Sequence, residues 1–360
     1  MALTINSSGK GMRSTAVDLL VGAPENLVVV TDAPVQRVLL EGKKAVDRAS
    51  HDIILSAGSL DTPKILFHSG IGPSTLSQFS IPVHHDLPSI GQGLKDHFSA
   101  PLIITRNPST NTRNEFFQDK AAMAAAFKQW ELDGTGPWAK YGCQIGSGWF
   151  KSERITSTPE FDDLPEATKA FMNRETIPHY EIVTNRPIHW SIPDRFQVYS
   201  YICLAVLLMN EQSSGEVRLQ SSNPDDPLLF DPKCLEHPFD RRACVEMYKH
   251  LLDVTDHPSF AKDTISTMLG PKSRSDEDIL QFWRQNLSSS WHMTGTVKMG
   301  KAGQSNAAVD SHFRVLGMES LRVADMSVVP VLTNNHTQAT AYVTGLTCAE
   351  VLIEEYQLDV

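Results

Sequence analysis

The chain has 360 residues, of which 41% are hydrophobic and 21% charged, and its formal net charge is −10. This composition is typical of a soluble globular protein with one large domain or two of ordinary size. The acidic balance disfavours nucleic acid as a partner, because neutralising phosphates takes clustered Lys and Arg.

Targeting and redox signals are weak. No segment reaches the ~18 consecutive apolar residues that a membrane span requires, and the N-terminus lacks a charged-then-apolar signal pattern. We therefore expect a cytoplasmic protein without a membrane partner. The five cysteines are odd in number and never spaced as C-x-x-C, which favours inert thiols in a reducing compartment.

The first third of the chain alternates between β-rich and helical patterns. Residues 27–30 and 35–40 are β-rich runs separated by a turn-prone segment, and residues 51–55 form a further predicted strand. Asp61-Thr62-Pro63 then reads as a helix start, with the helix ending at Ser69-Gly70. A strand that passes through the small residues Ala57-Gly58 into a helix start can hold an anionic group, although an ordinary strand–turn–helix is the alternative.

The character changes from about residue 98 to residue 290, where prolines, aromatic residues and long polar stretches are interspersed. Helices are predicted over 119–130 and 241–254, and strands over 199–208 and 216–219. Residues 152–195 are predicted to form surface loops and short helices.

Two histidine segments near the C-terminus carry the strongest chemical signal. Residues 288–300 read SSSWHMTGTVKMG and include His292; residues 334–340 read NNHTQAT and include His336. An apolar strand pattern at 321–329 lies between them. Two imidazoles delivered from opposite ends of one strand-bearing segment can converge on a single reacting atom, as general-base chemistry requires.

These segments, together with three others, resemble the glucose–methanol–choline (GMC) family of flavin-dependent oxidoreductases. Residues 56–73, SAGSLDTPKILFHSGIGP, are similar to a specific signature of that family. Residues 87–97, LPSIGQGLKDH, and 213–219, SSGEVRL, resemble further family segments, with Gly93 and Ser214 where Asn and Arg are common. The sequences around both histidines look most like those of fungal family members that serve secondary-metabolite pathways.

The resemblance implies a fold of the α+β or α/β class. We expect a partial FAD-binding Rossmann-like domain from residues 1–98 and 291–360, with a substrate-binding domain, built on an antiparallel sheet, inserted at 99–290. The family's opening strand and Gly-x-Gly-x-x-Gly fingerprint, which binds the dinucleotide pyrophosphate, have no counterpart in this sequence. We therefore expect the first βαβ unit to be lacking, leaving an exposed edge and apolar face.

The resemblance also implies the chemistry. FAD would accept a hydride from an alcohol, His292 would take the hydroxyl proton, and His336 would hold the same oxygen. Oxygen or another acceptor would reoxidise the flavin, and the substrate would be a small-molecule alcohol. The residues expected to lie at the cofactor are Val35, Ala57, Gly58, Trp291, Asp325, Met326, Thr337 and Gln338.

Three alternatives compete with parts of this interpretation. His292 and His336 could hold a metal, for which Asp325 is the nearby third ligand; we expect no metal. The chain could act through the same histidines as a non-redox enzyme without tightly bound flavin. It could also be a catalytically inactive, truncated remnant of the family that survives as a binding or structural protein.

Overall fold

The computed structural model describes residues 15–46, 49–108, 116, 119–141, 146–184 and 200–358. The chain divides into two compact units. Unit 1 consists of residues up to 31, 98–209 and 241–288, and unit 2 consists of residues 32–97, 210–240 and 289–360. None of the helices in the described ranges is long and apolar enough to cross a membrane.

Unit 1 is built around an antiparallel sheet that runs in the order β13–β7–β10–β9–β8. Strand β7, whose residues are almost all buried, pairs with β10 along nearly its whole length. The elements are η1 (Ala16–Leu20), β7 (Phe98–Arg106), α3 (Lys120–Asp133), α4 (Pro137–Tyr141), β8 (Gly146–Phe150), α5 (Glu153–Thr156), α6 (Pro159–Asp162), α7 (Glu166–Met172), β9 (Tyr180–Thr184), β10 (Tyr201–Leu208), α8 (Pro238–Asp256), α9 (Pro258–Ala261), β13 (Thr264–Leu269), α10 (Asp276–Asn286) and β14 (Ser288–Ser289).

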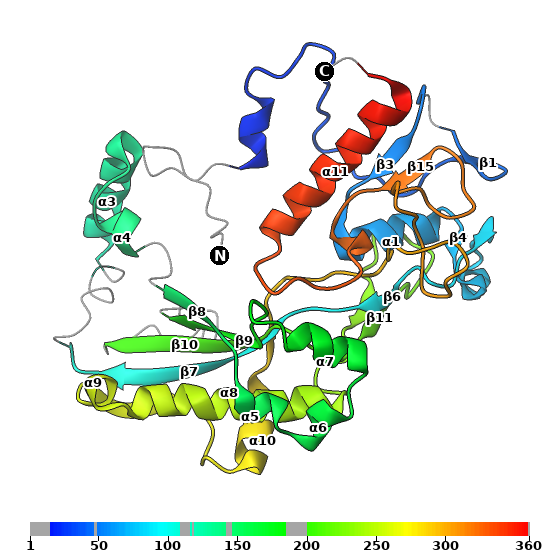
Figure 1. Ribbon diagram of the computed structural model, residues 1–360. Coiled ribbons are helices and arrows are strands. Elements are labelled where there is room, and N and C mark those ends of the chain that lie inside the picture. The colour runs from blue at the N-terminus through cyan, green and yellow to red at the C-terminus, as the bar shows by residue number, and fades with distance from the viewer. Residues whose placement is uncertain are drawn as a thin grey trace. The chain divides into compact units, whose positions relative to one another are not determined.

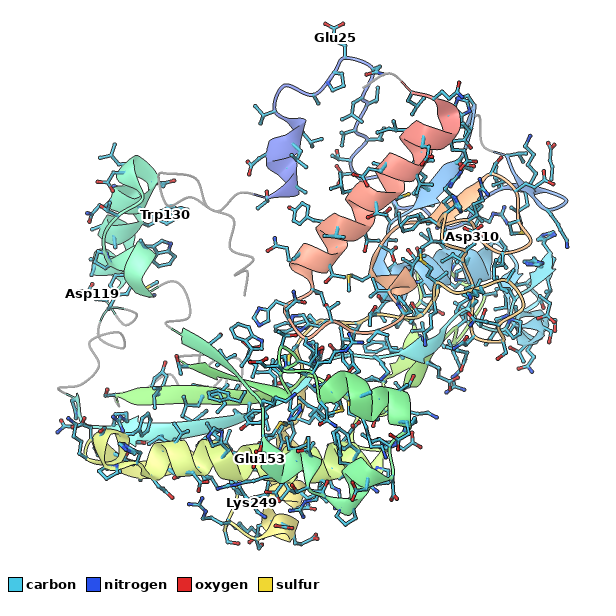
Figure 2. All side chains as sticks on the ribbon, viewed as in Figure 1. Glu25, Asp119, Trp130, Glu153, Lys249 and Asp310 are labelled. Carbon is cyan, nitrogen blue, oxygen red and sulfur yellow. The ribbon has the colours of Figure 1, made fainter. Side chains whose placement is uncertain are left out.

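Helix α8 covers one face of this sheet (Figure 1). The buried Tyr248 hydroxyl on α8 donates to the Pro101 carbonyl on β7 over 2.8 Å. On α10, the buried Trp283 indole donates to the Cys244 carbonyl over 3.1 Å. Lys249, labelled on α8 in Figure 2, forms ion pairs with a glutamate of its own helix and with α10. Buried aromatic contacts therefore fix the helices, and surface charges add a secondary connection.

Unit 2 contains several small sheets packed around helix α1 (Figure 1). Strands β3 and β15 pair in parallel, β12–β11–β6 form an antiparallel sheet, and β4 pairs with β5 in parallel. The elements are β1 (Leu40–Glu41), β2 (Lys44–Ala45), β3 (Ile53–Leu55), α1 (Gly58–His68), β4 (Ile71–Gly72), η2 (Ser74–Phe79), β5 (His85–Asp86), β6 (Gln92–Leu94), β11 (Gly215–Arg218), β12 (Leu229–Asp231), β15 (Leu321–Val323), η5 (Met326–Val328) and α11 (Gln338–Tyr356).

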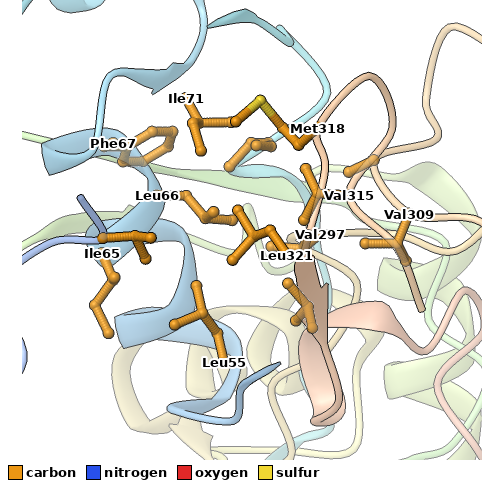
Figure 3. Packing of buried hydrophobic residues seen from close by; sticks show 14 of the residues in the cluster. Leu55, Ile65, Leu66, Phe67, Ile71, Val297, Val309, Val315, Met318 and Leu321 are labelled. Carbon is orange, nitrogen blue, oxygen red and sulfur yellow. The ribbon is translucent and has the colours of Figure 1, made fainter. Parts of the chain in front are cut away.

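One apolar core joins the three chain segments of unit 2 (Figure 3). Leu66 and Phe67 of α1 lie in this cluster with Leu321 of β15 and with Val297, which belongs to the first histidine segment. Burial of apolar area stabilises the fold by roughly 25 cal/mol per Å². The histidine segment is therefore anchored through the core to the strand–turn–helix of residues 53–68.

The predicted elements agree with the structure where a local signal is strong. The helix predicted over 119–130 is α3: Asp119 accepts hydrogen bonds from the Ala121 and Ala122 amides, and Gly134 ends the helix in the left-handed region. The strands predicted at 199–208 and 216–219 correspond to β10 and β11, and the helix at 241–254 lies within α8.

Three predictions were wrong. Residues 180–184, predicted to lie in surface loops and short helices, form the largely buried strand β9; residues 185–195 of the same prediction lie outside the described residues. Residues 27–30 and 35–39 form no strand, because their side chains are mostly exposed and no described segment pairs with them; only Leu40–Glu41 is extended in a sheet. Helix α1 begins at Gly58, three residues before the predicted start. Pro63 is therefore its sixth residue and gives the Ser59 carbonyl no intrahelical donor; that carbonyl accepts the Thr296 hydroxyl over 2.7 Å instead.

The division into units differs from the predicted domains in two segments. Residues 210–240 group with unit 2, because β11 pairs with β6 rather than with the sheet of unit 1. Residues 15–31 group with unit 1. The other boundaries, at 97/98 and 288/289, lie within two residues of the predicted ones.

Candidate active site around three histidines

The two predicted catalytic histidines come together in unit 2. His292 lies in an irregular segment after β14, and His336 lies two residues before the first residue of α11. Their ring centroids are 5.1 Å apart, with the ring planes inclined by 42°. Both rings are partly buried. A single polar group of a small ligand can therefore contact both imidazoles.

A third histidine belongs to the same group. His97, which directly follows β6 and Lys95-Asp96, is fully buried, and its Nδ1 lies 3.0 Å from Nδ1 of His292. The two rings meet edge to face, with centroids 5.1 Å apart. The sequence of residues 87–97 resembles a family segment but does not by itself indicate a role for His97. Its position beside an acidic residue in that segment was the signal available.

Asp96 fixes the backbone of the His292 segment. Its Oδ1 accepts a hydrogen bond from the His292 amide over 2.8 Å, and its Oδ2 accepts one from the Ser289 hydroxyl. The Ser289 oxygen in turn accepts the Trp291 amide over 2.9 Å. Trp291 has φ 58°, a left-handed conformation that is unfavourable for a bulky residue. The surrounding hydrogen bonds hold this strained turn in place.

Burial shifts the pKa values of His292 and Asp96 in opposite directions. Burial and the neighbouring His336 lower the pKa of His292 from 6.5 to about 4. Burial raises the pKa of Asp96 from 3.8 to about 6, although the hydrogen bonds from Ser289 and His292 oppose it. Because the pKa of His292 is lower in the folded state, the stability of the fold decreases as pH falls from 6.5 to 4. Because the pKa of Asp96 is higher in the folded state, its contribution to stability increases as pH falls from 6 to 3.8. The two contributions largely offset each other.

The two asparagine side chains before His336 differ in their contacts. Asn334 Nδ2 donates to Asn210 Oδ1 over 2.8 Å. The buried Oδ1 of Asn335 has no hydrogen-bond partner among the described residues. A buried amide oxygen without a donor is costly, so this atom is suited to accept a hydrogen bond from a ligand beside His336.

The predicted cofactor residues separate into two groups. Asp325 accepts hydrogen bonds from the Gly58 amide (2.9 Å), the Thr62 hydroxyl (2.6 Å) and the Ser327 amide (2.7 Å). The Met326 carbonyl accepts the Thr294 hydroxyl over 2.6 Å. Asp325 and Met326 thus connect the start of α1 to the His292 segment, and the carboxylate of Asp325 acts within the protein.

The remaining predicted residues line open surface of unit 2 or begin α11. Thr337 is the N-cap of α11 and Gln338 its first residue, directly after His336. Ala57 is exposed, and Gly58, with φ 88°, has nothing within 4 Å of the position a Cβ would occupy. Val35 and Trp291 are 61% and 65% exposed. Trp291 adjoins His292 in the chain, whereas Val35 lies on an irregular stretch before β1.

A metal ligand set built on Asp325 has little chemical support. Both oxygens of that carboxylate already accept hydrogen bonds from protein groups. Within the described ranges, no group of three or more His, Cys, Asp or Glu residues is arranged to hold a metal ion.

A buried glutamate beside this site should make stability depend on pH. Glu211 is almost fully buried; burial raises its pKa from 4.5 to about 8, which the nearby Lys95 only partly counteracts. The folded state therefore loses stability as pH rises from 4.5 through 8. We expect the stability advantage of Glu211→Gln over the wild type to be roughly 1–3 kcal/mol larger at pH 9 than at pH 6.

Urea unfolding at the two pH values measures this effect, with the exposed Glu350→Gln as the matched control. Equal loss of stability between pH 6 and pH 9 in the wild type and Glu211→Gln would contradict the assignment of a neutral Glu211.

Comparison with known proteins gives the family. Models of the GMC oxidoreductase family match residues 9–99 and 211–345. The chain belongs to the glucose–methanol–choline oxidoreductase family. The matched regions include the His97, His292 and His336 segments and the strand–turn–helix at residues 53–68.

Relatives of this family member include fungal and bacterial proteins. The chain is 30% identical to the dehydrogenase pkfF of Emericella nidulans, over 84% of this chain and 49% of that protein. It is 29% identical to the patulin synthase of Penicillium expansum, over 89% of this chain and 53% of the synthase. The chain thus spans about half the length of the curated relatives it matches.

The fold of this family member is also that of solved structures. The formate oxidase of Aspergillus oryzae matches with a TM-score of 0.84 at 22% identity, over 97% of this chain and 64% of the oxidase. This likeness, with the antiparallel sheet of unit 1 and the parallel β3–β15 pair of unit 2, confirms the expected mixed α/β class.

Proposed function

We propose that the protein oxidises a small-molecule alcohol, with His292 accepting the hydroxyl proton and FAD accepting the hydride. The observation that carries this proposal is the pair of imidazoles whose centroids lie 5.1 Å apart, one of them with a pKa of about 4. A histidine with that pKa is neutral at physiological pH, so its ring offers a lone pair to the hydroxyl proton of the alcohol.

The residues of unit 2 fit the flavin end of FAD. The open space before Gly58, the exposed Ala57 and the buried Asn335 Oδ1 without a donor offer room and an acceptor for a polar ring system. The Ala57 and Gly58 amides already donate to Thr62 and Asp325. Contact at this turn would therefore depend on close backbone approach rather than on those two amide donors.

His292 acts as the base and His336 as its partner. One ring nitrogen of His292 faces His97, which leaves Nε2 to receive the hydroxyl proton. His336 adjoins the same space and is followed by the N-terminus of the 19-residue helix α11, whose dipole favours negative charge. Both features stabilise a developing alkoxide. When bound, FAD supplies the hydride acceptor, while the protein orients the alcohol.

The printed names of the relatives support alcohols as the substrate class. They include an alcohol dehydrogenase of Pseudomonas putida and the fungal patulin synthase. We infer a role in a fungal secondary-metabolite pathway from the relatives in Emericella and Penicillium. Oxygen or another acceptor would reoxidise the flavin.

The activity should persist at unusually low pH. Because burial and His336 hold the pKa of His292 near 4, the base stays neutral well below pH 6.5. We expect the acidic limb of kcat/KM to fall near pH 4, as read from initial rates between pH 3.5 and 8. A limb near pH 6.5 would mean that the base is a solvated histidine instead.

Flavin binding and alcohol turnover test the proposal directly. The purified chain is incubated with FAD, separated from free cofactor by gel filtration and examined for visible flavin absorbance. A panel of aliphatic and aromatic alcohols is then assayed with oxygen and with an artificial dye acceptor. Retained flavin that is bleached anaerobically by an alcohol supports the proposal. A colourless protein that cannot be loaded with FAD would overturn it and favour the non-redox or binding alternatives.

A further inference from the structure

His97 and Asp96 act on His292 from a buried position. His97 is fully buried and Asp96 nearly so, so neither offers a surface to a substrate. Both nevertheless bond to His292: His97 through the ring and Asp96 through the backbone amide. Their contacts are therefore suited to orienting His292 rather than to taking part in the reaction.

The segment that carries Asp96 and His97 is hydrogen-bonded to the His292 segment both before and after His292. The Lys95 and Thr294 backbones exchange two hydrogen bonds, and the Ser290 amide donates to the His97 carbonyl over 2.9 Å. With the Asp96 contacts to Ser289 and His292, these bonds fix the main chain before and after His292. The imidazole can therefore change only its side-chain rotation and its tautomer.

The contact between His97 and His292 joins Nδ1 to Nδ1, so only one of the two nitrogens can carry the hydrogen between them. If His97 donated, a neutral His292 would carry its proton on Nε2 and could not accept one there. If His292 donates, Nε2 presents a lone pair. Which nitrogen is protonated is set by the hydrogen bond that the other makes.

We propose that His97 is a positioning residue that accepts the Nδ1–H of His292, and that Asp96 holds the backbone in the matching orientation, so that Nε2 of His292 is kept as the basic nitrogen. This inference deepens the proposed function and rests on it for its catalytic consequence. The tautomer itself is a property of the chain without cofactor or substrate. In other enzymes, loss of tautomer control at a catalytic histidine costs on the order of 10⁴-fold in kcat.

The tautomer can be read directly by nitrogen NMR. The full chain is labelled with ¹⁵N-histidine, and the His292 signals are assigned by their loss in His292→Gln. At pH 7.5 we expect a protonated Nδ1 and an unprotonated Nε2 on His292. A protonated Nε2 in the wild type would overturn the inference without any further variant.

Two substitutions at His97 separate positioning from packing. His97→Asn keeps an amide oxygen near the place of Nδ1 and should preserve the Nδ1–H tautomer. His97→Leu fills similar space without an acceptor and should shift His292 toward Nε2–H. Thermal unfolding of both variants identifies a protein that fails to fold. If a folded His97→Leu keeps the wild-type tautomer, His97 does not set it.

Activity of the FAD-loaded protein supplies the second readout. We expect kcat to fall on the order of 10²-fold or more in His97→Leu, with KM little changed, and to stay within about tenfold of the wild type in His97→Asn. Equal losses in the two variants would indicate a packing role and overturn the inference. If FAD loading fails altogether, the proposed function falls, whereas the NMR result still decides the tautomer.

Discussion

Replacing His292 with glutamine should lower the rate of alcohol oxidation by the FAD-loaded protein by about 10²–10⁴-fold, the range that a positioned general base supplies. Glutamine retains a polar group near Nε2 but cannot accept a proton at neutral pH. The rate to measure is anaerobic flavin bleaching after rapid mixing with the alcohol, because this isolates substrate oxidation from reoxidation of the flavin.

Two controls define the result. His312→Gln changes an exposed histidine outside the site and should leave the rate unchanged. His336→Asn should cost less than His292→Gln, because an amide can still hold the substrate oxygen by a hydrogen bond. If His292→Gln bleaches the flavin within tenfold of the wild-type rate while His336→Asn is inactive, the base is His336 and our assignment is reversed.

The elements that the sequence predicts well are those with a local cause. Asp119 and Gly134 mark both ends of α3 by side-chain capping and a left-handed turn, and neither depends on distant residues. The β-rich run at 35–40 is predicted as a strand on its local composition, yet only Leu40–Glu41 pairs in a sheet. A strand needs a partner, and the local pattern does not specify one.

The candidate site likewise contains residues that a local sequence signal predicts and contacts that depend on distant residues. The sequence motifs around His292 and His336 predict both residues as catalytic, because the residues beside each histidine resemble the family's segments. The Nδ1–Nδ1 contact with His97 arises from the pairing of Lys95 with Thr294, which are far apart in the sequence. The same holds for Asp325: its bonds to Gly58 and Thr62 depend on the parallel pairing of β15 with β3. Long-range register of this kind has no local signature.

Replacing Arg322 with methionine should reduce the free energy of unfolding by about 3–5 kcal/mol, the cost of breaking a buried ion pair by removing one partner. The Arg322 side chain is only 1% exposed. Its Nε donates to Asp52 over 2.6 Å, Nη1 to the His312 carbonyl over 2.6 Å and Nη2 to Glu355 over 2.7 Å. One guanidinium thus connects β15, the residue before β3 and the last turn of α11.

The cost falls mainly on Asp52, whose side chain is 8% exposed and also accepts the Tyr356 hydroxyl over 2.7 Å. Without Arg322 that carboxylate is buried with one neutral donor, so Asp52→Asn in the Arg322→Met background should recover part of the lost stability. Arg314→Met removes a more exposed arginine from the same Glu355 and should cost less than about 1 kcal/mol.

Urea unfolding followed by circular dichroism and by tryptophan fluorescence measures all four proteins, and agreement between the probes tests whether the unfolding is a single transition. If Arg322→Met costs no more than Arg314→Met, the buried network does not stabilise unit 2. If the double variant is no more stable than Arg322→Met, the lost stability comes from the guanidinium's contacts with His312 and Glu355. It then does not come from leaving the Asp52 carboxylate buried without its cation. Because Glu355 and Tyr356 end α11 and His336 lies two residues before its first residue, loss of this anchor should also loosen the segment that carries the second histidine.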